Sequence, residues 1–234
     1  MRTQQSSVTA QGIAAIRAVE SSKSPGQRIC YDPLARRLVN PFFYFLAKAF
    51  AGYGERKAPG TAGFLVARAR YIDDYLEAGL DSGINQLVIL GAGLDSRAYR
   101  FERLRGRVAV FEVDHPATQR GKRQRLRKVF GELPNQVTFV PVDFNEEGLD
   151  KLFGFGYDRR QKTLFIWEGV TYYLMAEAVD STLEFVSKNS GQGSSIVFDY
   201  VYTSALTAAS KRGDIARMQR YSRFTGERLN RRGP

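Results

Sequence analysis

The sequence has very few residues of the kinds that bind metals or form disulfides. Among its 234 residues there is one cysteine, Cys30, and one histidine, His115. A single cysteine excludes a disulfide within the chain and a zinc site built from several cysteines. A single histidine excludes a metal centre with several histidine ligands. We therefore expect no metal site.

Long apolar runs are also missing. The longest one, residues 42–50, is interrupted by Lys48, and a membrane-spanning helix needs about 20 apolar residues. Residues 1–11 are polar and lack the apolar stretch of a secretory signal. With 43% hydrophobic and 25% charged residues, the composition is that of a folded domain. We expect a cytoplasmic protein with no membrane partner.

Positive charge is in excess and is concentrated in two segments. The formal net charge is +11. Residues 97–128 contain 11 basic and 3 acidic residues, and residues 211–234 contain 8 basic and 2 acidic residues. A basic patch such as residues 120–128 can bind nucleic acid, but no aromatic residues are interleaved within 120–128 for base stacking. We favour the alternative that residues 120–128 form the solvated face of a helix, and we expect no nucleic-acid partner.

Short apolar runs alternate with helical stretches through the second half of the chain. The predicted strands are residues 87–90, 107–113, 136–140, 163–167 and 195–200. The predicted helices between them are residues 116–130, 146–153 and 175–189, and a further helix is predicted at 205–218. Strands that alternate with helices predict an α/β fold, with a parallel sheet covered by helices on both faces.

The first third of the chain is predicted to be helical. Apolar residues recur at helical spacing in residues 11–21 and 64–78. Asp32 followed by Pro33 is typical of a helix start, which predicts a helix through Leu38. We therefore divide the chain into a helical cap at 1–80, an α/β core at 81–204, and a basic helical or lid segment at 205–234.

A glycine loop follows the first predicted strand. Gly91 and Gly93 allow a tight turn and a close approach of a ligand to the backbone. The helix start that follows offers free N–H groups to an anion. The dinucleotide fingerprint would place a third glycine where Ser96 stands, which disfavours a nicotinamide or flavin cofactor. A tight turn without a ligand is the alternative.

Acidic residues follow the second strand. Glu112 and Asp114 come about 20 residues after the glycine loop, where a carboxylate meets the ribose hydroxyls of a nucleoside in a doubly wound sheet. A carboxylate can accept two hydroxyl hydrogen bonds at once. The alternative is that Asp114 caps the next helix, which begins near Pro116.

The third and fourth strands also end in acids. Asp143 and Phe144 follow the third strand, where they suit an adenine amino group and its ring. Glu168 ends the fourth strand. Ligands of open α/β sheets bind outside the carboxyl ends of the strands. The series of acids, together with the glycine loop, therefore predicts a ligand site at this edge of the sheet.

Four ordered motifs resemble the leucine carboxyl methyltransferase family, in particular its bacterial branch of S-adenosylmethionine-dependent methyltransferases. They are LGAGLDSRAYR at 90–100, FEVDHP at 111–116, VDF at 142–144 and EGVTYYL at 168–174. Residues 9–20 and the helix start at Asp32 are similar as well. The resemblance implies a class I methyltransferase fold, a Rossmann-like parallel sheet flanked by helices, with an N-terminal helical cap. The sheet is expected to lack the family's last pair of strands.

The resemblance also implies which residues bind S-adenosylmethionine. Arg68 would pair with the carboxylate of its methionine part. Asp114 would bind the ribose, with Glu112 as an outside candidate, and Glu168 would lie near the methionyl amine or the mouth of the acceptor site. The full set of implied cofactor-binding residues is Arg68, Gly91, Gly93, Asp114, Asp143, Phe144 and Glu168.

Catalytic residues are not assigned by this resemblance. Methyl transfer from a sulfonium is an in-line displacement that proximity and orientation can largely drive. Glu168 and Tyr173 are candidates at the acceptor mouth, and His115 is a candidate base by residue type. We expect O-methylation or carboxyl methylation of a small molecule or of a carboxylate such as a carboxyl terminus. A carboxylate acceptor would need no general base, whereas a hydroxyl acceptor could need one.

Three further possibilities stay open on the sequence. A nucleic-acid methyltransferase or binder could use the basic segment at 97–128, and an inactive module could bind S-adenosylmethionine without transferring its methyl group. A homo-oligomer would follow if the strand at 195–200 left an uncovered sheet edge, because such edges pair with other chains.

Overall fold

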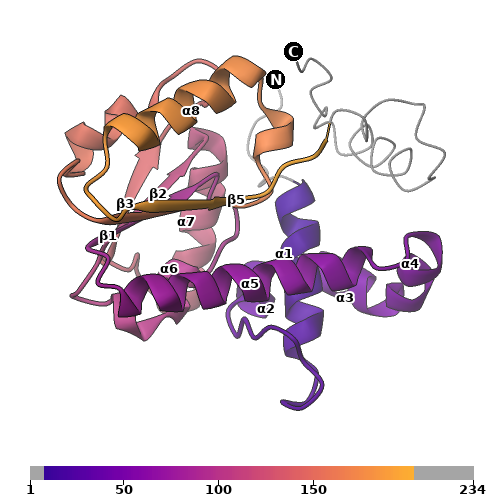
Figure 1. The fold of residues 1–234 in the computed structure, drawn as a ribbon. Helices are drawn as coiled ribbons and strands as arrows, with labels where there is room; N and C mark the ends of the chain where they lie inside the picture. Colours follow the sequence, from indigo (N-terminus) through magenta and orange to yellow (C-terminus); the bar gives the residue numbers. More distant parts are fainter. Residues whose placement is uncertain (1–7, 203–234) are drawn as a thin grey trace.

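A five-stranded parallel sheet forms the centre of the computed structural model, which describes residues 8–202 (Figure 1). The strands are β1 (Gln86–Leu90), β2 (Ala109–Asp114), β3 (Val137–Pro141), β4 (Thr163–Trp167) and β5 (Ser195–Phe198). Their order is β3-β2-β1-β4-β5. This α/β, Rossmann-like arrangement confirms the predicted fold class. The predicted helix at 205–218 and the lid segment at 205–234 lie outside the described residues.

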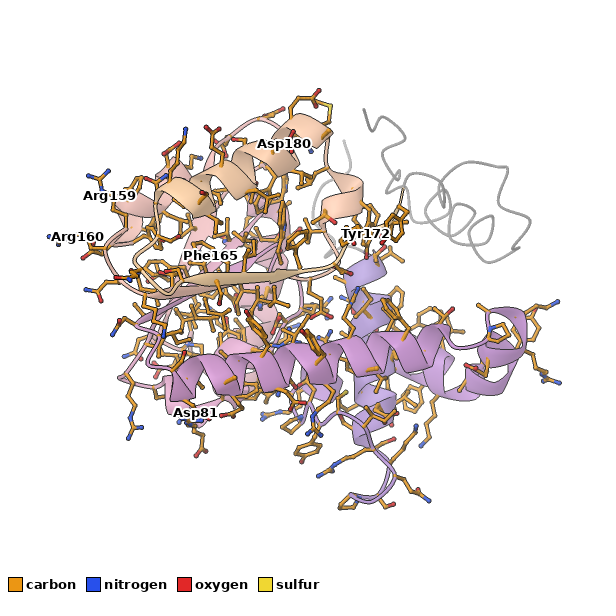
Figure 2. All side chains as sticks on the ribbon, viewed as in Figure 1. Asp81, Arg159, Arg160, Phe165, Tyr172 and Asp180 are labelled. Atoms are coloured by element: carbon orange, nitrogen blue, oxygen red, sulfur yellow. The ribbon has the colours of Figure 1, made fainter. Side chains whose placement is uncertain are left out.

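The strand order changes direction between β1 and β4, which pair with each other in parallel. In doubly wound sheets a ligand binds at such a switch point, outside the carboxyl ends of the strands. Figure 2 shows Tyr172 at this carboxyl end and Arg159 and Arg160 at the opposite end of the sheet. The strand order therefore places the crevice beside the glycine loop.

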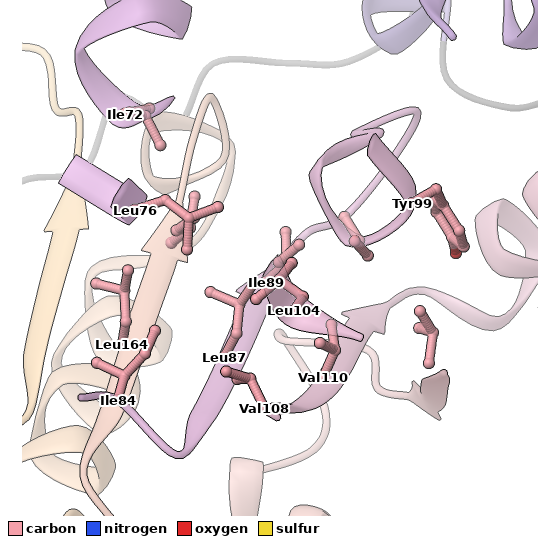
Figure 3. Packing of buried hydrophobic residues seen from close by; sticks show 14 of the residues in the cluster. Ile72, Leu76, Ile84, Leu87, Ile89, Tyr99, Leu104, Val108, Val110 and Leu164 are labelled. Atoms are coloured by element: carbon pink, nitrogen blue, oxygen red, sulfur yellow. The ribbon is translucent and has the colours of Figure 1, made fainter. Parts of the chain in front are cut away.

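The central strands are apolar on both faces because helices cover both faces. Every residue of β1 and of β4 is buried. Leu87 and Ile89 pack with Leu76 and Leu164 in one cluster (Figure 3). The alternate residues of β1 belong to a second cluster, which contains Trp167. Continuous apolar runs, rather than alternating ones, therefore predicted these strands correctly.

Helices form the two outer layers of the sheet. Residues of α5 (Thr61–Asp81), α6 (Arg97–Arg100) and α7 (Pro116–Phe130) belong to the first cluster, and residues of α8 (Ala176–Lys188) belong to the second. Figure 1 shows α8 above the sheet and α5 below it. The remaining short helices of the core are η1 (Glu102–Leu104), η2 (Leu149–Phe155) and η3 (Thr171–Tyr173).

The predicted helical stretch at 146–153 is wrong in its start, and it is a 3₁₀ helix, η2, rather than an α-helix. The backbone amides of Glu146 and Glu147 donate to the carbonyl of Asp143, so these residues form a turn. Helical turns begin only at Leu149, as the 3₁₀ helix η2. The Asp143 side chain accepts from the amide of Asn145 and closes the turn, a local bond that competes with helix formation.

Four further helices precede α5 and form a layer beside the carboxyl ends of the strands. They are α1 (Val8–Ser21), α2 (Ala35–Leu38), α3 (Pro41–Ala49) and α4 (Ala51–Lys57). Asp32 Oδ1 accepts from the amides of Leu34 and Ala35, so the predicted cap is present, although the helix begins at Ala35. Leu94 of the glycine loop packs among small residues of α1, including Ala14 and Ala18.

Two features of the surface bear on partners. Within residues 8–202, no helix has both the length and the hydropathy needed to cross a membrane. In the same residues β5 pairs with β4 along one edge, and no strand of the described sheet covers its other edge. A homo-oligomer through this edge stays a prediction.

Candidate cofactor site

A cleft of about 370 Å³ opens at the carboxyl ends of β1, β2 and β4. All seven residues predicted to bind the cofactor line it, namely Arg68, Gly91, Gly93, Asp114, Asp143, Phe144 and Glu168. His115 and Tyr173 line it too, and α1 contributes Ile13 and Arg17. The fold therefore brings together residues from positions 9 to 174, while their individual roles stay predictions.

The glycine loop needs glycine at its first position. Gly91 has a φ of 64°, a left-handed conformation that side chains disfavour. A Cβ at Gly91 would also lie 2.3 Å from Cγ2 of Val170, in the segment that follows β4. Gly93, with a φ of 41°, turns its N–H toward Asp114. The loop is therefore closely packed against the far wall of the cleft.

Asp114 connects the end of β2 to the glycine loop. Its Oδ2 accepts from Gly93 N at 2.6 Å, and its Oδ1 accepts from His115 N at 2.7 Å. Burial raises the pKa of Asp114 above its usual range, against the effect of these two hydrogen bonds. The carboxylate oxygens keep lone pairs for further donors, such as ribose hydroxyls.

The alternative in which Asp114 caps the next helix is wrong. His115 is the N-cap residue of α7, and its Nδ1 accepts from Ala117 N at 3.2 Å. The other ring nitrogen, Nε2, lies 3.7 Å from Oδ2 of Asp143. The imidazole therefore has a structural partner on one side and a carboxylate on the other.

Glu112 is not a ribose ligand in this structure. Its side chain is fully buried and does not line the cleft. It forms an ion pair with Lys122 of α7, with Nζ and Oε1 2.8 Å apart. Burial raises the pKa of Glu112 to about 7, although Lys122 acts in the opposite direction. The outside candidate is therefore wrong, because the side chain turns toward α7 instead.

Arg68 projects from α5 into the cleft and keeps one donor group free. Its Nε donates to Oε1 of Glu168 at 3.0 Å, and its Nη1 donates to Oδ2 of Asp199 at 2.5 Å. Its Nη2 is buried without a hydrogen-bond partner. Burial lowers the pKa of Arg68, but Glu168 and Asp199 outweigh it and the net pKa is raised. A buried unpaired donor is costly, so a ligand carboxylate fits here.

Glu168 is held between two arginines. Besides its bond to Arg68, its Oε2 accepts from Nη1 of Arg97 at 2.8 Å. Burial raises the pKa of Glu168, but Arg97 and Arg68 outweigh it and hold the pKa below its usual range. A carboxylate with a lowered pKa is a weak proton acceptor. The geometry therefore favours a binding role over a general-base role for Glu168.

Phe144 and Asp143 form one end of the cleft. The ring of Phe144 stacks on Trp167 with centroids 6.4 Å apart and planes inclined by 27°. The Asp143 side chain accepts from Asn145 N at 3.1 Å and is 31% exposed. This end therefore combines an aromatic face with an accessible carboxylate, the features predicted for an adenine site.

Comparison with known proteins decides the family. Residues 10–187 match the sequence profile of the Leucine carboxyl methyltransferase family. The chain belongs to this family. The match covers the helical cap and most of the sheet, so it confirms the family named from the four motifs.

The chain is similar to several proteins with curated names. The Bacillus subtilis (strain 168) protein "Putative S-adenosyl-L-methionine-dependent methyltransferase YktD" is 37% identical over 163 residues, which are 69% of this chain and 53% of that protein. A "Putative S-adenosyl-L-methionine-dependent methyltransferase" of Mycobacterium sp. (strain KMS) is 36% identical and covers 84% of this chain and 67% of that protein. The chain thus spans between half and two thirds of the length of these relatives.

A solved structure is similar at a lower level. The S-adenosylmethionine-dependent methyltransferase from Clostridium acetobutylicum ATCC 824 has a TM-score of 0.44 and 15% identity, and it covers 70% of this chain and 61% of that chain.

Sequence reasoning missed four charged residues at or next to the cleft. Arg17 and Asp95 line it, and Asp199 and Arg97 bond to residues that line it. Asp199 follows β5 and bonds Arg68, and its Oδ1 accepts from Gly169 N at 2.6 Å. Arg97 pairs with Asp73 and Asp95 as well as Glu168. Arg17 of α1 donates to the carbonyl of Leu94 at 2.9 Å. Asp199 could have been found, because it follows the last described strand as the other acids follow theirs.

The basic segment at 97–128 is partly structural. Four of its basic side chains form ion pairs, namely Arg97, Arg100, Arg103 and Lys122. The prediction that the charges of α7 all face solvent is wrong for Lys122, which is buried. Paired and buried charges are poor ligands for phosphates, which weakens the nucleic-acid alternative. The basic tail at 211–234 lies outside the described residues.

Proposed function

We propose that the cleft binds S-adenosylmethionine and that the chain is a methyltransferase. The observation that carries the proposal is the buried, unpaired Nη2 of Arg68 in a cleft that also presents Asp114 and the glycine loop. These groups match the parts of the cofactor. The Arg68 cation suits its carboxylate, the Asp114 carboxylate suits its two ribose hydroxyls, and the close-packed glycine loop suits its linear methionyl chain. Relatives named as S-adenosyl-L-methionine-dependent methyltransferases support the proposal.

Each of these residues has a defined part in the proposal. Arg68 donates Nη2 to the methionine carboxylate, while Glu168 and Asp199 hold its guanidinium in place. Asp114 accepts from the ribose hydroxyls, and Gly91 and Gly93 lie against the methionyl portion. Asp143 and Phe144 hold the adenine. When bound, the cofactor supplies a methyl group on a positively charged sulfur, ready for attack by a nucleophile.

We infer that the acceptor is an oxygen nucleophile on a small molecule, and a carboxylate fits best. A carboxylate is ionised at neutral pH and needs no base, whereas an alcohol needs its proton removed. The two candidate bases, Glu168 and His115, are engaged: two arginines hold Glu168, and Nδ1 of His115 accepts from Ala117 N. Orientation of two reactants is then the main contribution of the protein to the rate. Tyr173 lies at the cleft as a candidate to contact the acceptor.

The ribose assignment is tested by replacing Asp114 with alanine. We expect D114A to weaken binding of S-adenosylhomocysteine at least tenfold, because two charge-assisted hydrogen bonds are lost. Calorimetry measures the change, with D74A as the matched control, since Asp74 is 59% exposed on α5 and pairs with Arg70. Unchanged affinity in D114A would contradict the ribose role. No heat of binding in the wild type, with either form of the cofactor, would contradict the proposed function, and heat with NAD instead would identify an oxidoreductase.

A further inference from the structure

A fully buried ion pair lies next to the glycine loop but outside the cleft. Lys122 of α7 is 1% exposed and Glu112 of β2 is fully buried. Lys122 Nζ is 2.8 Å from Oε1 of Glu112 and 3.4 Å from the carbonyl oxygen of Ala92, between the two loop glycines. One ammonium group therefore links a helix, a strand and the glycine loop.

Stability alone does not account for this pair. Removing two charges from water costs several kcal/mol per ion, and apolar replacements of buried ion pairs are often neutral or stabilising. The charged and polar groups that face Glu112 are Lys122 from α7, Tyr99 from α6 and Asp95 from the loop. Lys122 is the only positively charged group among them, so it alone neutralises the charge of Glu112.

The position of the pair connects it to cofactor-binding atoms. Glu112 and Asp114 are two residues apart on β2, and alternate residues of a strand face the same side. The residue after Ala92 is Gly93, whose N–H donates to Asp114 Oδ2. Lys122 also lowers the pKa of Asp114, opposing the larger effect of burial. A shift of the Ala92 carbonyl would therefore move the peptide unit that holds Asp114.

We propose that Lys122 and Glu112 are positioning residues, which fix the glycine loop and Asp114 in the geometry that binds the cofactor without touching it. The proposal rests on the proposed function of the cleft. Because the pair lies outside the cleft, its effect on affinity must pass through the loop backbone.

The test separates position from stability by replacing both charges with apolar side chains of similar volume. We expect E112L/K122M to unfold within a few degrees of the wild type, or above it, and to bind S-adenosylhomocysteine at least tenfold more weakly by calorimetry. The control is E77Q/R103Q, which removes a pair with both partners 43% exposed, and which should change neither value. Binding by E112L/K122M within twofold of the wild type would overturn the proposal.

A second readout follows the loop itself. The Gly93 amide should exchange its hydrogen at least tenfold faster in E112L/K122M than in the wild type, because its bond to Asp114 is loosened. Unchanged exchange would overturn the proposal even if affinity fell. If the apolar variant does not fold, E112Q/K122Q removes both charges but keeps polar side chains, and the same losses are expected. A wild type that binds no S-adenosylhomocysteine contradicts the proposed function, whereas the exchange comparison still tests the positioning.

Discussion

At the scale of single residues, the cleft depends on backbone conformations that few side chains tolerate. Gly91 combines a positive φ with a hypothetical Cβ only 2.3 Å from Val170, while Gly60 has a positive φ and nothing within 4 Å. A side chain at Gly60 would meet backbone strain alone, whereas a side chain at Gly91 would meet backbone strain and steric overlap, so the two effects can be compared within one chain. They also show that a glycine in a sequence motif can be needed for packing as much as for ligand access.

We expect G91A to lower the free energy of unfolding by about 2–4 kcal/mol, since a left-handed φ costs on the order of 1 kcal/mol or more and overpacking typically costs about 1–3. The matched control, G60A, should lose only about 1 kcal/mol. Urea denaturation of both variants measures the difference. Equal losses would show that Val170 moves aside without cost.

The single cysteine allows a clean test of burial. Cys30 is 3% exposed, and burial raises the pKa of its thiol to about 11. Because only the thiolate is a nucleophile, we expect a thiol reagent at pH 8 to react more than tenfold slower with the native protein than with the unfolded chain. The native rate should rise with pH up to about pH 11. Equal rates for native and unfolded protein at pH 8 would place Cys30 at the surface.

At the scale of elements, α1 contacts both the rest of the helical cap and the glycine loop. Arg17 pairs with Asp32 at 3.1 Å and donates to the Leu94 carbonyl at 2.9 Å. Burial raises the pKa of Asp32, but Arg17, Arg100 and a hydrogen bond with Ser96 together outweigh it, and the net pKa is lowered. The ionised pair therefore contributes stability above about pH 4, the usual range of an aspartate, and this contribution is lost as the pH falls through the lowered pKa.

Removing Arg17 leaves Asp32 buried without its ion-pair partner. We expect R17M to lower the free energy of unfolding at pH 7 by about 3–5 kcal/mol, the usual cost of breaking a buried pair. R70Q is the control, because the Arg70–Asp74 pair is more than half exposed on both sides and such pairs contribute about 1 kcal/mol or less. Thermal or urea unfolding measures both. A loss below about 1 kcal/mol in R17M would mean that the Arg17–Asp32 pair contributes little to holding α1 in place.

The strands and helices of the core were largely predictable from the sequence, because the period of the hydrophobic pattern and the length of each apolar run indicate the element type. Apolar runs of four to seven residues between helical stretches predicted all five described strands, and Pro116 fixed the start of α7. The segment after Asp143 was not predictable in this way, because a side-chain turn replaced the first turn of the expected helix. Local hydrogen bonds of this kind leave no period in the sequence.

At the scale of the whole molecule, the cleft is built from the helical cap and the sheet together. Ligand that binds only the folded state stabilises it by about 2.7 kcal/mol at 100 times its dissociation constant. Saturating S-adenosylhomocysteine should therefore raise the unfolding midpoint by roughly 5–10 °C, taking about 2–4 °C per kcal/mol for a chain of this size. Differential scanning fluorimetry measures the shift, with NAD as the control ligand. An equal shift with NAD would contradict the cofactor assignment.

The sequence by itself determined three features of this protein. They are the succession of strands and helices along the chain, the glycine loop, and the acids at three strand ends. They follow from local period, from turn residues and from the rule that parallel strands end at one edge of the sheet. Those local signals were sufficient to predict a ligand site at that edge and six of the residues that line it, and the family resemblance added Arg68.

Only the tertiary structure decided which charges meet. Glu112 and Asp114 are equivalent in sequence, yet one pairs with Lys122 behind the loop and the other faces the cleft. Asp199 reaches Arg68 across 131 positions of the chain. Burial and pairing of charges depend on contacts between residues far apart in sequence, and no local pattern encodes them. For the same reason the positive segment at 97–128, prominent in the composition, contributes several of its charges to the interior.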